Sequence, residues 1–141
     1  MSLIVLKNFK RQHREIRDLI GTLTPLLDHE PLTRDPAKVR YILSTLAGKL
    51  MIHFAMEDHF LYPALKEKND QRLQSLGDKF FAKTGDLMIV FQNYSQKWIN
   101  PVLIRENPDS FIQESKDIFL LLLHRIEEED QELYPILEKA G

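Results

Sequence analysis

Cysteine is absent from this 141-residue sequence, which contains only five glycines and seven prolines. Without thiols the chain cannot form a disulfide scaffold, a thiolate metal site, an iron–sulfur cluster or a cysteine nucleophile. The lack of cysteine is also compatible with a reducing cytosol. The few glycines and prolines gather at a small number of positions, which favours long helices joined by short connections.

Long apolar runs and a strong net charge are absent as well. The longest apolar run, Ile118 to Leu123, has six residues, whereas a membrane span needs about 20. The net charge is −2 and the basic residues are scattered, so the composition favours neither nucleic acid nor an anionic membrane as a partner. The first residues lack the basic leader and cleavage site of a signal peptide. We therefore expect a cytoplasmic protein with no membrane and no nucleic acid as partner.

Four segments carry apolar residues at alternating spacings of three and four, the pattern of helices with one inward face. Proline-containing stretches at Asp28 to Asp35 and Asn100 to Asp109 separate segments, and Pro63 should disrupt the second helix near its end. We predict an all-α fold, an antiparallel up-down-up-down four-helix bundle that forms one domain over residues 1–141. The inward positions of the first two segments are Phe9, His13, Ile16, Ile20, Leu23 and Leu27, then Val39, Leu43, Leu46, Leu50, His53, Glu57 and Phe60.

The second and fourth segments share an internal repeat. EDHFLYPAL, residues 57–65, aligns without gaps on EDQELYPIL, residues 129–137, with six of nine positions identical. A histidine precedes each copy, His53 four residues before Glu57 and His124 five residues before Glu129. This pattern is typical of a pseudo-twofold bundle in which alternate helices each direct a histidine and a carboxylate inward.

These titratable residues lie on inward helical faces. His53 and Glu57 are four residues apart, so they share one face of a helix, and both fall on the apolar stripe. His13 is flanked on its own stripe by Phe9 and Ile16. A buried carboxylate costs several kcal/mol unless it is paired or coordinates a metal, and a buried imidazole needs partners for both nitrogens. The sequence therefore predicts a cation between the helices, and imidazole with carboxylate suits iron, zinc or manganese.

Each of these residues also has a simpler interpretation. A histidine and a glutamate at this spacing more often form a surface pair, and His13 alone would be interpreted as a core histidine bonded to the backbone. His124 precedes four consecutive acids, and such runs usually face solvent. The repeat and the position on the apolar stripe favour metal ligation. Within the acidic run, Glu129 and Glu128 compete for the inward position.

The sequence resembles the hemerythrin-like family, including its HHE cation-binding members. The resemblance rests on QHREI (residues 12–16), HFAMEDHFLYP (53–63) and HRIEEEDQELYP (124–135). It implies two non-haem irons bridged by carboxylates, which carry, sense or store O₂ or handle nitric oxide. The ligands it implies are His13, His53 and His124 as terminal ligands and Glu57 and Glu129 as bridging ligands, with Glu128 as the rival of Glu129.

One departure from the family concerns the third helix. The oxygen carriers place two histidines there, whereas this chain has no histidine between His59 and His124, and Phe80 and Thr84 take the inward positions. In the family, one iron depends on helices one and two and the other on helices three and four. The resemblance thus implies one complete and one depleted half-site. A mononuclear site, an asymmetric di-iron site and a site that has lost its metal are all open.

The leading hypothesis is a cytoplasmic non-haem iron-binding protein, with one or two irons or another divalent metal, that binds or senses O₂ or nitric oxide without turnover. A di-iron-type enzyme that reduces O₂, peroxide or nitric oxide is an alternative, although no separate substrate pocket or nucleophile motif is evident. A structural or interaction bundle with a decayed metal site is the third possibility.

Overall fold

The computed structural model describes residues 3–140, and every regular element in this range is a helix, which confirms the predicted all-α class. The elements are α1 (Leu3–Leu23), the 3₁₀ turn η1 (Thr24–Leu26), α2 (His29–Arg34), α3 (Pro36–Met56), the π-helical turn η2 (Glu57–Leu61), α4 (Tyr62–Glu67), α5 (Gln71–Lys97), α6 (Pro101–Glu106), α7 (Pro108–Glu128), the π-helical turn η3 (Glu129–Leu133) and α8 (Tyr134–Ala140).

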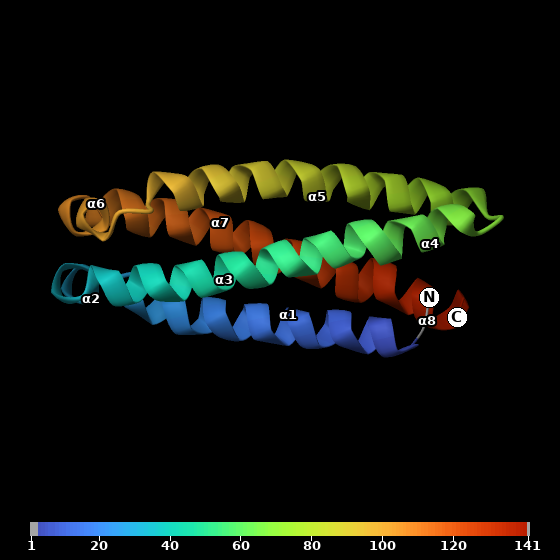
Figure 1. Ribbon diagram of the computed structural model, residues 1–141, viewed down its shortest axis with the longest axis horizontal. Helices are drawn as coiled ribbons and strands as arrows, with labels where there is room; N and C mark the ends of the chain where they lie inside the picture. The colour runs from blue at the N-terminus through green and yellow to red at the C-terminus, as the bar shows by residue number, and fades with distance from the viewer. Residues whose placement is uncertain (1–2, 141) are drawn as a thin grey trace.

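The long helices α1, α3, α5 and α7 lie lengthwise in a bundle (Figure 1). The short helices α2 and α6 lie at one end of it, and α4 and α8 lie at the other. Asp35 caps α3 by accepting a hydrogen bond from the backbone N–H of Lys38 at 3.1 Å, and Pro36 supplies a first-turn residue whose missing N–H costs nothing there. Asp70 caps α5 in the same way. No helix in residues 3–140 has both the length and the apolar composition needed to cross a membrane.

The stretches that were expected to be plain connections contain helices of their own. Asp28 to Asp35 holds α2, because Asp28 caps its first turn and Pro31 falls early enough in the helix to need no hydrogen-bond partner. The stretch after Asn100 holds α6, with Pro101 at its first position. The connections are therefore more helical than the sequence pattern indicated.

The expected disruption of the second helix near Pro63 takes the form of a π-helical turn, not of a break in the helix. The chain widens into η2, where the N–H of Tyr62 donates to the carbonyl of Glu57 five residues earlier, and it then continues into α4. A π-helical turn shifts the register by one residue, so Pro63 is accommodated without a break. The same shift exposes Phe60, which was predicted to face inward, and buries Leu61 in its place. The second copy of the repeat forms η3 with the same bond, from Tyr134 to Glu129.

The core consists of two apolar clusters with polar residues between them. The α2-side cluster includes Ile16, Leu50 and Ile126, and the α4-side cluster includes Phe9, Leu61 and Leu133. Three helical segments run from one cluster to the other. In each segment a buried titratable residue lies between an apolar residue of one cluster and an apolar residue of the other. These residues are His13 between Phe9 and Ile16, His53 between Leu50 and Leu61, and Glu129 between Ile126 and Leu133.

Candidate metal centre

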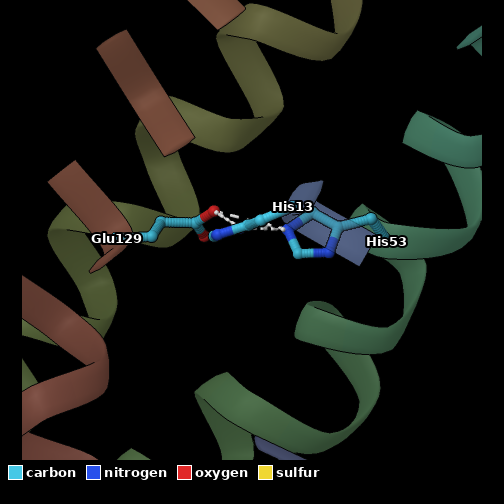
Figure 2. A group of neighbouring side chains, drawn as sticks. All are labelled: His13, His53 and Glu129. Carbon is cyan, nitrogen blue, oxygen red and sulfur yellow. Dashed lines mark hydrogen bonds and ion pairs between the residues drawn. The ribbon is translucent and has the colours of Figure 1, made fainter. Parts of the chain in front are cut away.

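Four titratable side chains meet in this polar layer. His13 comes from α1, His53 from α3, Glu57 from the start of η2 and Glu129 from the start of η3. Each of the four is at most 1% exposed. Figure 2 shows His13, His53 and Glu129 converging from three different helical segments. Among residues 3–140, these three form the group of histidine and acidic side chains whose geometry could hold a metal ion.

The donor atoms are spaced as ligands of one ion would be. The Nε2 atom of His13 lies 3.1 Å from Nε2 of His53 and 3.0 Å from Oε1 of Glu129. The Nε2 atom of His53 lies 3.3 Å from the same oxygen. For metal–ligand bonds of about 2.1 Å, neighbouring ligands are about 3.0 Å apart at right angles and about 3.4 Å apart in a tetrahedron. The three observed distances lie within this range.

Hydrogen bonds on the far side of each ring direct the Nε2 atoms inward. His13 donates from Nδ1 to the carboxylate of Asp130 at 2.8 Å, and Arg17 holds that carboxylate at 2.6 Å. His53 donates from Nδ1 to Oε1 of Gln12 at 2.7 Å. A ring whose Nδ1 carries the proton presents the lone pair of Nε2 to the cluster, which is the arrangement found around metal-bound histidines.

Glu57 lies beside this group of three without belonging to it, with Oε1 at 2.9 Å from Nε2 of His53. With both carboxyls ionised and Nε2 of His53 unprotonated, residues 3–140 offer no hydrogen-bond donor to either oxygen of Glu57 or to Oε2 of Glu129. Three carboxylate oxygens without a donor in a buried layer would be costly. A cation among them removes this cost, so two imidazoles and two carboxylates fit a metal such as iron, zinc or manganese.

The pKa values of the metal-free cluster follow from the same contacts. Burial alone lowers the pKa of His53, but the nearby Glu57 and Glu129 outweigh it and raise that pKa from 6.5 to about 10. Burial, followed by the charge of Glu129, raises the pKa of Glu57 well above its usual range. Burial opposes ionisation of Glu129, yet its hydrogen bonds with Glu57, His13 and His53 lower its pKa. Protons therefore neutralise the cluster where a metal would otherwise do so.

We expect the metal-free protein to lose stability as the pH rises from 7.5 towards 9.5. In this window folded His53, with its pKa of about 10, holds a proton that an unfolded histidine has released. The free energy of unfolding should therefore fall by about 1.4 kcal/mol per pH unit, and the raised pKa of Glu57 acts in the same direction. Urea unfolding with a chelator at three pH values measures the slope. His53→Gln, which binds no proton, should flatten it, and a wild-type slope of zero would contradict the prediction.

His124 and Glu128, both predicted as candidate ligands, lie outside the cluster. The side chain of His124 is 75% exposed and its Nε2 lies 3.4 Å from Glu128. Glu128 also accepts a hydrogen bond from Lys83 at the surface. Arg125, four residues before Glu129, lies on the same inward face of the helix. His124 is one residue further back, which rotates its side chain by about 100° away from that face. Glu129, and not its rival Glu128, is the carboxylate that faces the histidines.

The inward positions of α5 hold no histidine or acid, as the sequence indicated. Thr84 and Phe80 are buried there, and Thr84 shares a hydrogen bond of 2.9 Å with the hydroxyl of Tyr62. The buried guanidinium of Arg125 donates to the carbonyl of Phe80 at 2.8 Å and to Thr84. The positively charged side chain of Arg125 thus occupies the part of the polar layer that faces α5.

Sequence reasoning missed three residues that contact the histidines. Gln12 and Asp130 orient the rings, and the hydroxyl of Tyr134 lies 3.1 Å from Nε2 of His13. Tyr134 was not considered as a neighbour of the histidines. Its presence in both copies of the repeat gave no indication of its partner, and the adjacency of Gln12 and Asp130 to proposed ligands does not reveal which ring each one contacts.

Comparison with known proteins is consistent with this geometry. Searches of curated proteins and of solved structures each found no significant match. The family model of the hemerythrin HHE cation-binding domain matches residues 5–137, a range that contains all four side chains of the cluster. The chain therefore belongs to the hemerythrin HHE cation-binding domain family.

Proposed function

We propose that this protein binds non-haem iron at the cluster of His13, His53, Glu57 and Glu129, and that it binds or senses O₂ or nitric oxide there without turnover. One observation carries the proposal. Two imidazoles are oriented towards two buried carboxylates, and three oxygens of these carboxylates, when ionised, have no hydrogen-bond donor among residues 3–140 unless Nε2 of His53 is protonated. A metal ion held by His13, His53 and Glu129, with Glu57 beside it, would offset these buried charges.

The four side chains have distinct tasks in this proposal. His13 and His53 would hold the ion through Nε2, and Glu57 and Glu129 would balance its charge. When bound, iron with this ligand set would supply open coordination positions for a small diatomic molecule. The apolar clusters on both sides keep the layer out of water, which strengthens electrostatic interactions within it.

Tyr134 is the protein group best placed to interact with a ligand at the cluster. Burial and the charge of Glu129 raise the pKa of its phenol well above its usual range, so the hydroxyl keeps its proton. Its ring stacks on the ring of His13, with centroids 5.0 Å apart. Tyr134 therefore holds a hydrogen-bond donor beside Nε2 of His13.

Metal analysis together with optical spectroscopy tests the proposal. Protein produced with ample iron should contain about one or two equivalents, and the spectrum of the reduced protein should change when O₂ or nitric oxide is added. Protein that is free of metal after such expression would contradict the proposal. Steady consumption of O₂, peroxide or nitric oxide with a reductant would favour the enzymatic alternative over simple binding.

The arrangement and location of the protein belong to the same proposal. We propose that α3, η2 and α4 act as one long helix, that α7, η3 and α8 act as another, and that the four resulting helices form one domain in antiparallel up-down-up-down order. The cytoplasm is the proposed location, since a chain without cysteine suits a reducing compartment.

A further inference from the structure

The repeat extends one turn further back than its identical residues indicate. A shift of 72 positions places Glu57 on Glu129 and Tyr62 on Tyr134, and it places His53 on Arg125. The three residues of each copy are all buried. In each copy the first residue lies in an α-helix, the second in the π-helical turn that follows it, and the third in the next α-helix. The counterpart of His53 is therefore Arg125, and not the exposed His124.

The partners of the two tyrosines extend this correspondence to the remaining helices. The hydroxyl of Tyr134 lies 3.1 Å from Nε2 of His13 on α1, and the hydroxyl of Tyr62 lies 2.9 Å from Oγ1 of Thr84 on α5. Thr84, as the partner of Tyr62, thus corresponds to His13, the partner of Tyr134. The polar layer therefore has one half around His13 and His53 and a second half around Thr84 and Arg125. One half of the polar layer offers two imidazoles, and the other offers a guanidinium and a hydroxyl.

Arg125 is fixed in the second half by several contacts. Its Nη2 donates to the carbonyl of Phe80 at 2.8 Å, to Thr84 and to the hydroxyl of Tyr62 at 3.3 Å. The guanidinium carbon lies 4.4 Å from the centre of the Phe80 ring, a cation–π contact. The residue is only 4% exposed. Guanidinium keeps its charge at any pH that a protein tolerates and has no lone pair to offer a metal.

We propose that Arg125 occupies the second half-site and limits the centre to a single metal ion. This inference rests on the proposed metal-binding function and specifies its nuclearity. A fixed positive charge in a layer of low dielectric repels a second divalent cation, and this repulsion is far stronger than it would be in water. The guanidinium supplies, one turn before Glu129, the positive charge that a second ion would otherwise bring to this half of the layer.

Counting bound ions in matched variants tests this inference. The full-length protein, stripped with a chelator, is titrated with Mn(II), and the bound ion is counted by mass spectrometry after gel filtration. Wild type should saturate at about one ion per chain and give the electron paramagnetic resonance signal of an isolated Mn(II). Arg125→His combined with Thr84→His should restore the missing imidazoles, double the bound Mn(II) and give the signal of two coupled ions.

Two control variants separate the role of Arg125 from general effects. Arg125→Lys keeps a positive charge and should still bind one ion, and Lys116→His adds a histidine to the exposed face of α7 and should also bind one. A coupled Mn(II) pair in wild type would overturn the inference and leave the proposed function intact. Unchanged binding by a double variant that circular dichroism shows to be folded would also overturn it. If that variant does not fold, the wild-type count and signal decide the inference, and wild type that binds neither Mn(II) nor Fe(II) refutes the proposed function itself.

Discussion

Replacing His53 and Glu57 together by alanine should leave the protein without tightly bound metal. The double variant removes one of the two imidazoles and one of the two buried carboxylates, whose closest atoms are 2.9 Å apart. Loss of an outer hydrogen-bond partner of a metal ligand typically costs 10–100-fold in affinity, so loss of two direct ligands should cost on the order of 1,000-fold or more. Metal content after iron-replete expression, and competition with a chelator of known affinity, measure the effect.

The same substitutions should leave the fold intact. Replacing both members of a buried ionic pair leaves neither partner buried without the other and removes the cost of desolvating both, so the loss of stability is limited to the space that the alanines leave unfilled. Far-ultraviolet circular dichroism of the double variant should therefore match that of wild type. Loss of metal together with loss of helix would trace the effect to folding instead of ligation.

His124→Ala is the matched control for this experiment. It also removes a histidine that the sequence marked as a ligand, but the side chain is 75% exposed and its Nε2 lies 3.4 Å from Glu128, away from the cluster. Full metal content in His124→Ala, beside none in the double variant, is the expected outcome. If His124→Ala lost its metal and the double variant kept it, the cluster of His13, His53, Glu57 and Glu129 would not be the metal site.

The helical fold and most of the cluster were predictable because their signals are local. Spacings of three and four mark the inward face of a helix whatever the other helices do. His13, His53 and Glu57 lie on such faces and are buried in the structure as expected. The repeat identified Glu129 in the same way, because matched segments present matched residues to the interior.

The remaining features depend on register and on tertiary contacts. A π-helical turn adds one residue to a helical turn, so Phe60 lies outside and Leu61 inside. Counting back from Glu129, the inward residue is Arg125 at four positions, and a histidine at five positions points to solvent. No spacing rule predicts that Gln12 orients His53 from another helix, since only the packed bundle brings them together.

Removing the metal should lower the melting temperature by on the order of 10 °C. A ligand that binds only the folded state, at a concentration about 1,000 times its dissociation constant, stabilises that state by about 4 kcal/mol. For a domain of this size, each kcal/mol shifts the midpoint by roughly 2–4 °C. Without metal, the cluster must instead retain a charged His53 and a protonated Glu57, both buried. Calorimetry of iron-loaded protein with and without chelator measures the shift.

The double variant His53→Ala with Glu57→Ala makes this result specific to the cluster. Its melting temperature should be the same with and without chelator, because it has no tight site from which metal can be withdrawn. A wild-type midpoint that is equally indifferent to iron and to chelator would favour a bundle whose metal site has decayed. In that case protons shared within the cluster would have to satisfy the three carboxylate oxygens that otherwise have no donor. The wild type would then lose stability at alkaline pH whether or not metal is present.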